Sequence, residues 1–232
     1  MVFWSLKKIK IAVVFQDNCV QIMYGKHIIE KVFPLKDGRE RITCVREITN
    51  FDEMQIFIGH IFKEILPTFT FIFGNLEIYA TCTPLSGILE KRAITDSFKK
   101  VRCVKKVNLV EFPIATLAGL QLIDQKRYLL IDLDTHCCYI TLIDNGKVIL
   151  FKETSLCSIG GILRVVQNII NNSTNRVDQC WLVGSNMDIV DCYSKLQKIG
   201  FPIQIAGDAN FVTINGLAML AVNSKWNHIG VE

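Results

Sequence analysis

Residues 128–156 read YLLIDLDTHCCYITLIDNGKVILFKETSL, the stretch from which the fold class follows most directly. It holds three β-prone apolar runs, and Asn145-Gly146 between the last two is a dipeptide typical of a tight hairpin turn. Residues 8–33 repeat the pattern, with KIKIAVVFQDNCVQIMY at 8–24, a turn at residues 24–26 and HIIEKVF at 27–33. The sequence therefore predicts two successive three-stranded meanders.

Alternating helices and strands follow each meander. Asp52 is the predicted N-cap of a helix over 53–66, whose apolar residues recur at helical spacing until Pro67 ends it. The other elements predicted for the first half are a strand at 76–83, a helix at 88–101, a strand at 105–112 and a helix at 113–122. Those predicted for the second half are a helix at 161–170, a strand at 180–184, a helix at 187–199, a strand at 202–206 and a helix at about 211–223.

This order predicts an α/β protein of two halves, residues 1–124 and residues 125–232. Each half is expected to be a mixed sheet with a three-stranded meander and flanking helices, and the two halves are expected to face a central cleft. The last helix belongs to the second half in sequence, and an alternative is that it packs back on the first half. No low-complexity linker separates the halves, so we expect them to pack closely.

Composition excludes several classes of protein. With 50% hydrophobic and 21% charged residues and a mean hydropathy of +0.31, the chain can bury a sizeable core. A net charge of +4 is too small and too dispersed to predict nucleic-acid binding. The richest apolar stretch, residues 56–73, is interrupted by charged residues and proline, so no membrane-spanning helix is expected, and the first residues do not resemble a secretory leader. Nine scattered cysteines without CxxC spacing argue against disulfides and zinc and favour a reducing cytoplasm.

Several stretches of the chain carry a resemblance to a known family. Residues 81–101, TCTPLSGILEKRAITDSFKKV, and residues 107–120, VNLVEFPIATLAGL, resemble MreB, the bacterial actin-like ATPase. The segments VFPLKDGRERI at 32–42, YLLIDLD at 128–134 and WLVGSN at 181–186 are similar to the same family in the same order. The resemblance implies two ribonuclease-H-like halves. It also implies that both small outer subdomains are missing, because the chain is too short at those places.

The family holds Mg·ATP between two glycine-rich turns, each with an aspartate. In the first turn the resemblance retains Asn18 only; Phe15 stands at the glycine position, where its ring is expected to occupy phosphate space, and Asp17 offers a substitute through a register shift. In the second turn Asp132 is retained and is the candidate metal ligand. Asp134 replaces a glycine there and is expected to repel phosphate.

Alternatives remain open at the second turn. A metal bridging Asp132 and Asp134, with His136 as a third ligand, competes with the simpler interpretation that Asp132 ends a strand and His136 is an ordinary turn residue. The resemblance implies an acidic residue that positions the attacking water, and Phe112 stands at that position in this chain. Its neighbour Glu111 is a poor substitute, because adjacent residues point to different faces. We therefore predict no ATPase activity.

Binding candidates also lie on the adenosine side and at the N-terminus. Gly184, Ser185, Asn186 and Gly216 match nucleotide-binding positions; alternatively, these glycines end a strand and allow close helix contact. An anionic-membrane anchor is predicted from aromatic and basic residues, with a plain lead-in to the first strand as the alternative. The anchor residues are Phe3, Trp4, Leu6, Lys7 and Lys8.

These features lead to two functional hypotheses. The first is a catalytically silent actin-like scaffold that acts through protein partners or self-association at the cytoplasmic face of the inner membrane. Cell shape, the cytoskeleton and envelope-machine assembly are the processes considered. The alternative is an ATP-binding, filament-forming bacterial actin with a non-standard site. No cofactor is expected under the first hypothesis, and weakly bound ATP with Mg²⁺ is expected under the second.

Overall fold

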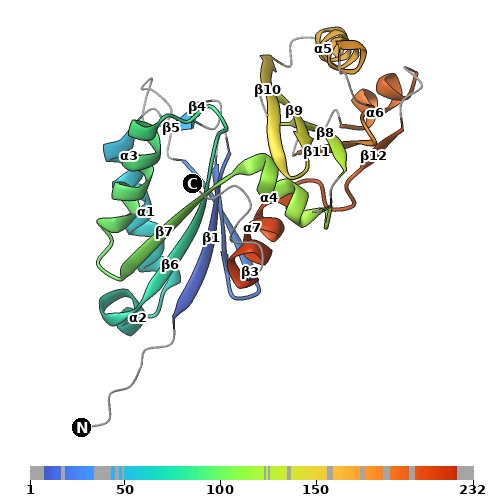
Figure 1. Cartoon of the computed structure of the whole chain (residues 1–232). Helices are drawn as coiled ribbons and strands as arrows, with labels where there is room; N and C mark the ends of the chain where they lie inside the picture. The colour runs from blue at the N-terminus through green and yellow to red at the C-terminus, as the bar shows by residue number, and fades with distance from the viewer. Residues whose placement is uncertain are drawn as a thin grey trace.

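The computed structural model describes residues 8–16, 19–33, 43–44, 47–48, 50–122, 124, 126–134, 137–155, 159–172, 176–184, 189–198 and 202–223. Two five-stranded sheets of the same topology form its frame (Figure 1), in the orders β3-β2-β1-β6-β7 and β10-β9-β8-β11-β12. In each sheet the first three strands form an antiparallel meander, and the last two run parallel to the first strand. The predicted fold class is confirmed.

The first half contains most of the helices. Its strands are β1 (Ile9–Phe15), β2 (Cys19–Tyr24), β3 (His27–Val32), β4 (Thr43–Cys44), β5 (Glu47–Ile48), β6 (Leu76–Cys82) and β7 (Val104–Glu111). Its helices are α1 (Phe51–Ile65), α2 (Thr68–Phe73), α3 (Ile88–Lys99) and α4 (Phe112–Gly119). The remaining elements are β8 (Arg127–Leu133), β9 (Cys137–Asp144), β10 (Lys147–Ser155), α5 (Ile159–Asn172), β11 (Gln179–Gly184), α6 (Ile189–Gln197), β12 (Ile203–Ile205) and α7 (Val212–Val222).

The structure confirms the turn predicted at residues 145–146 and corrects the predicted N-cap of the first helix. Asn145 and Gly146 have φ of 50° and 72°, so the predicted hairpin turn is confirmed. The predicted N-cap Asp52 is wrong, because Asn50 caps α1 by accepting a hydrogen bond from the Glu53 N–H at 3.1 Å, and Asp52 lies inside the first turn. Pro67 ends α1 as predicted, but it also precedes α2, a short helix that the sequence did not predict.

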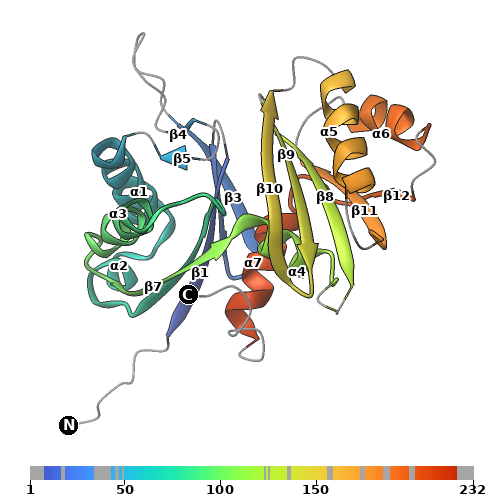
Figure 2. The ribbon, with the colours of Figure 1, turned by 45° about the horizontal axis from the view of Figure 1, so that its top comes forward.

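The layers alternate between helices and sheets. One face of the first sheet packs against α1 and α3, and the opposite face packs against α4 and α7. The same two helices cover one face of the second sheet, whose far face packs against α5 and α6 (Figures 1 and 2). Because both faces of each sheet are covered, the central strands are apolar on both sides, which explains their nearly continuous hydrophobic runs. The cysteines whose side chains are described are buried, and none of them is in a disulfide.

Close contact between α4 and α7 joins the two halves. A Cβ at Gly216 would clash with the Ala115 carbonyl oxygen, and a Cβ at Gly119 would clash with the Val212 carbonyl oxygen. A hydrogen bond of 2.9 Å between the Thr116 and Thr213 hydroxyls lies beside this crossing. The glycines therefore let the two helix backbones approach each other directly.

Candidate functional site

Two hairpin turns occupy equivalent places in the two sheets. The Gln16 N–H donates to the Cys19 carbonyl at 2.9 Å between β1 and β2, and the Asp134 N–H donates to the Cys137 carbonyl at 2.9 Å between β8 and β9. Equivalent backbone hydrogen bonds therefore close the two turns that the sequence assigned to phosphate binding. Asn18, Asp17 and His136 lie outside the described residues, so their predicted roles stay predictions.

The first turn is anchored to the neighbouring strand. The Phe15 N–H donates to Thr81 Oγ1 at 3.2 Å. The Phe15 ring packs against Phe98 of α3 with ring centroids 6.1 Å apart, and only 2% of the residue is exposed. The expectation that this ring fills phosphate space is not met, because alternation along β1 directs the side chain into the core beneath α1 and α3.

Two buried carboxylates lie where β8 enters the second turn. Asp132, the last but one residue of β8, is 3% exposed, and Asp134, the first residue after β8, is 1% exposed. Burial raises the pKa of the neighbouring Cys138 thiol, and the charge of Asp132 is among the further causes. Within the described ranges, no group of three or more His, Cys, Asp or Glu side chains is placed to hold a metal ion. The metal role of Asp132 stays a prediction.

On the predicted adenosine side, the structure shows why glycines are needed. Gly184, at the end of β11, has φ of +115°, and a Cβ there would lie 2.7 Å from the Leu133 backbone nitrogen. Gly216 lies in the contact of α7 with α4, which is the structural alternative considered for it. Ser185 and Asn186 fall outside the described part of the chain. Nucleotide binding at all four positions stays a prediction.

The residue before Pro113 is the most informative difference from the family pattern. Phe112 is 2% exposed, and its ring lies 5.3 Å from Tyr139 of β9 and 5.7 Å from Phe151 of β10, both edge to face. Tyr139 and Phe151 stack on each other at 5.9 Å. An aromatic cluster from both halves thus surrounds the position at which the resemblance implies a water-positioning acid. The sequence identified Phe112 but not its two partners, because contacts across the two halves leave no local signal.

Glu111 is directed elsewhere, as the sequence predicted. It lines a groove between α3 and β7 and lies near Lys91. Burial raises the pKa of the Glu111 carboxyl, and the charge of Lys91 partly offsets this rise. The carboxylate therefore belongs to the outer side of the first half rather than to the aromatic cluster.

Only one residue of the predicted membrane anchor is described. The Lys8 ammonium lies 2.6 Å from the buried Glu77 carboxylate, so an ion pair already balances its charge. Phe3, Trp4, Leu6 and Lys7 are outside the described residues, and their role stays a prediction.

Two ribonuclease-H-like halves, with equivalent hairpin turns and two helices packed between them, define a class of fold shared by nucleotide-binding and filament-forming proteins. It is the actin-like ATPase fold, and the length of 232 residues fits a minimal form of it.

Solved structures match the chain along nearly its whole length. MreB5 of Spiroplasma citri bound to ADP gives a TM-score of 0.74 at 13% identity, covering 96% of this chain and 98% of that one. The MamK double helical filament gives a TM-score of 0.66 at 8% identity, covering 94% and 99%. The PilM–PilN complex of type IV pilus biogenesis gives a TM-score of 0.66 at 8% identity, covering 92% and 98%. No protein-family model and no curated protein sequence matches. At these identities the likeness shows the fold.

Proposed function

We propose that this protein is a catalytically silent actin-like scaffold that acts through protein contacts at the membrane face. The observation that carries the proposal is Phe112. A buried aromatic ring packed on Tyr139 and Phe151 cannot orient a water molecule for attack on a phosphate.

The second turn also fits a triphosphate poorly. The resemblance implies a glycine N–H facing the phosphates at residue 134, and Asp134 instead brings a nearly fully buried carboxylate. Like charges at short range in a poorly hydrated site repel strongly. The residues described here therefore support loss of the phosphate machinery while the actin-like framework is kept.

Exposed apolar side chains near the start of β1 support contact with a membrane. In α2, Phe69 is 61% exposed and Ile72 is 38% exposed. The Ile9 N–H donates to the Asn75 carbonyl at 3.0 Å, so β1 begins next to the end of α2. β1, which follows the predicted anchor residues in the chain, therefore begins beside this apolar surface. The contact that we propose is peripheral. No helix in the described ranges reaches the length and apolarity of a bilayer-spanning segment.

We expect the melting temperature to be unchanged by excess Mg·ATP, and phosphate release to stay at the background of the heat-inactivated protein. A competent site would add about 2–3 kcal/mol of stability at a ligand concentration about one hundred times Kd. Differential scanning fluorimetry and a phosphate-release assay provide the two readouts. A higher melting temperature together with turnover that Glu111→Gln abolishes, or pelleting that depends on ATP, would support the filament-forming alternative and contradict the proposal.

Deletion of residues 1–7 is expected to reduce co-sedimentation with anionic liposomes by about tenfold or more, because it removes three apolar anchors and one lysine. The double variant Phe69→Ser/Ile72→Ser is expected to cause a smaller loss. Val190→Ser, which changes a 67% exposed side chain on α6, serves as the control and should bind as the parent does. Equal binding of the parent and the deletion would exclude the anchor.

A further inference from the structure

The outer edge of β7 is open. β7 pairs in parallel with β6 from Glu77/Lys106 to Cys82/Glu111, and within the described ranges no strand pairs with its other side. Figure 2 shows β7 at the front edge of the first sheet. An edge strand presents a row of backbone N–H and C=O groups that can pair with an additional strand.

A groove runs along this edge. It has a volume of about 470 Å³ and lies between β7 and α3. Its floor includes Val107 and Leu109, and its wall carries Lys91, Thr95 and Lys99, which are spaced four residues apart on one face of α3. A strand edge beside a helix is a geometry with which peptide-binding domains accept an extended segment as an extra strand.

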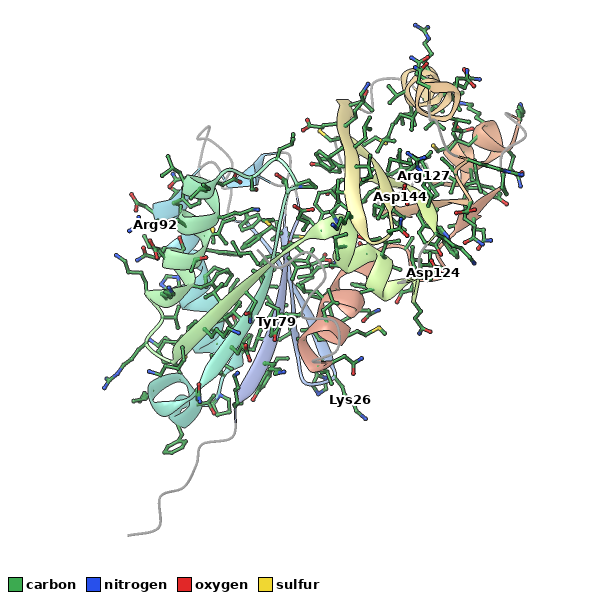
Figure 3. All side chains as sticks on the ribbon, in the orientation of Figure 1. Lys26, Tyr79, Arg92, Asp124, Arg127 and Asp144 are labelled. Atoms are coloured by element: carbon green, nitrogen blue, oxygen red, sulfur yellow. The ribbon has the colours of Figure 1, made fainter. Side chains whose placement is uncertain are left out.

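Charge determines which segment fits. Residues 98–107, FKKVRCVKKV, contain five basic side chains and no acidic one. Lys106 is 3.3 Å from Glu77, and Arg92, which Figure 3 labels on the outer side of α3, is 3.6 Å from Asp96. Lys99 and Lys105 have no carboxylate partner among the residues that the structure describes. Asp96 and Glu111 also line the groove, but Asp96 pairs with Arg92 and the charge of Lys91 acts on Glu111. The unbalanced charge, at the end of the groove where β7 starts, is therefore positive.

We propose that the β7 edge and the facing side of α3 bind an extended acidic segment of a partner protein, which joins the first sheet as a sixth strand. Every second side chain of such a segment enters the groove. Apolar groups there contact Val107 and Leu109, and carboxylates reach Lys99 and Lys105.

A second copy of this chain is a poorer occupant. Pairing β7 with another β7 would bring the lysines of both groove walls together, and lysines on an edge strand are one means by which proteins prevent such self-pairing. An acidic strand would instead be attracted to these lysines. The inference rests on the proposed function as an interaction protein and specifies the surface and the partner.

The test uses a fluorescent synthetic peptide of eight residues, the length of β7, in which two Glu alternate with two Val, so that each face of the extended peptide carries both residue types. Saturable binding that weakens with salt is expected, and hydrogen exchange of the β7 amides should slow in the complex. A peptide in which Lys replaces Glu should bind at least about tenfold more weakly, because its charge is reversed. A peptide with a central proline should also bind at least about tenfold more weakly, because proline lacks the N–H needed for the strand hydrogen bonds.

Charge-reversed variants complete the test. Lys99→Glu/Lys105→Glu should weaken binding of the Glu peptide about tenfold and strengthen binding of the Lys peptide. Lys26→Glu, at the β2–β3 turn on the other side of the same sheet and labelled in Figure 3, is the matched control and should leave both affinities unchanged. Equal affinity for both peptides, unchanged β7 exchange, or a dimer in sedimentation that Lys99→Glu/Lys105→Glu alters would overturn the inference. ATP turnover would refute the proposed function but not this site, so the two failures are distinguishable.

Discussion

Gly216→Ala is expected to destabilise the protein by about 3 kcal/mol, through overpacking at the crossing of α7 and α4. The added methyl group would clash with the Ala115 carbonyl oxygen and lie 2.9 Å from the Gly119 Cα. Backbone atoms on both helices cannot rotate away as a side chain can, so the helices must separate. That separation would also stretch the hydrogen bond between Thr116 and Thr213, and urea denaturation measures the total loss.

Gly59→Ala provides the control with the opposite sign. Gly59 lies inside α1, and a Cβ there would meet no atom within 4 Å. Replacing an unhindered helical glycine by alanine stabilises by up to about 1 kcal/mol, since alanine has the higher helix propensity and restricts the unfolded chain. If the free energy of unfolding of Gly216→Ala equalled that of Gly59→Ala, the inference that the two helix backbones touch at Gly216 would be wrong.

The second large effect is expected from Glu77→Gln. The Glu77 carboxylate has 3% exposure in the first sheet, 2.6 Å from Lys8 and 3.3 Å from Lys106, and it accepts a hydrogen bond from Asn108 at 3.0 Å. Burial raises its pKa, but these partners outweigh burial and lower the pKa from 4.5 to about 2. Tyr79, which Figure 3 labels, has its own pKa raised by burial and by the Glu77 carboxylate.

The sign of the pH dependence follows from that lowered pKa. Because the folded pKa lies below the unfolded one, Glu77 stabilises the fold fully above about pH 5, and this stabilisation is lost as the pH falls toward 2. Glu77→Gln should therefore lose about 2–3 kcal/mol at neutral pH and differ little from the parent near pH 2. Unfolding curves at several pH values measure this difference.

A surface ion pair supplies the comparison for Glu77. Glu64 lies 2.6 Å from Lys31, but its side chain is 61% exposed. Exposed pairs contribute up to about 1 kcal/mol, so Glu64→Gln should change stability little. A Glu77→Gln effect as small as that of Glu64→Gln would show that the buried network does not stabilise the fold.

Repeated local patterns explain why so much of the fold could be predicted. The two meanders, the Asn145-Gly146 turn and Pro113 in the first turn of α4 depend on neighbouring residues, and each was located within a few positions. The cap of α1 could also have been found, since Asn50 stands three residues before Glu53 in a capping-box spacing. The short helix α2 was missed because residues 68–73, TFTFIF, have strand-like composition.

The candidate site could be predicted only in part. The resemblance located the two turns, because such positions follow chain order, and its assignment of the water-positioning acid to Phe112 stays a prediction. It misplaced the Phe15 ring, whose direction depends on the core under α3. The aromatic cluster, the Glu77 network and the groove beside β7 each join residues distant in sequence, and no local pattern encodes such contacts.

The order of strands and helices and the fold class follow from the sequence alone, because backbone propensity and hydrophobic pattern are local properties. The tertiary structure was needed to show that α7 packs on α4 through Gly216, that Phe112 meets Tyr139 and Phe151, and that no described strand pairs with the outer edge of β7. These features arise when distant segments are brought within a few ångströms, and packing, not chain order, determines which segments meet.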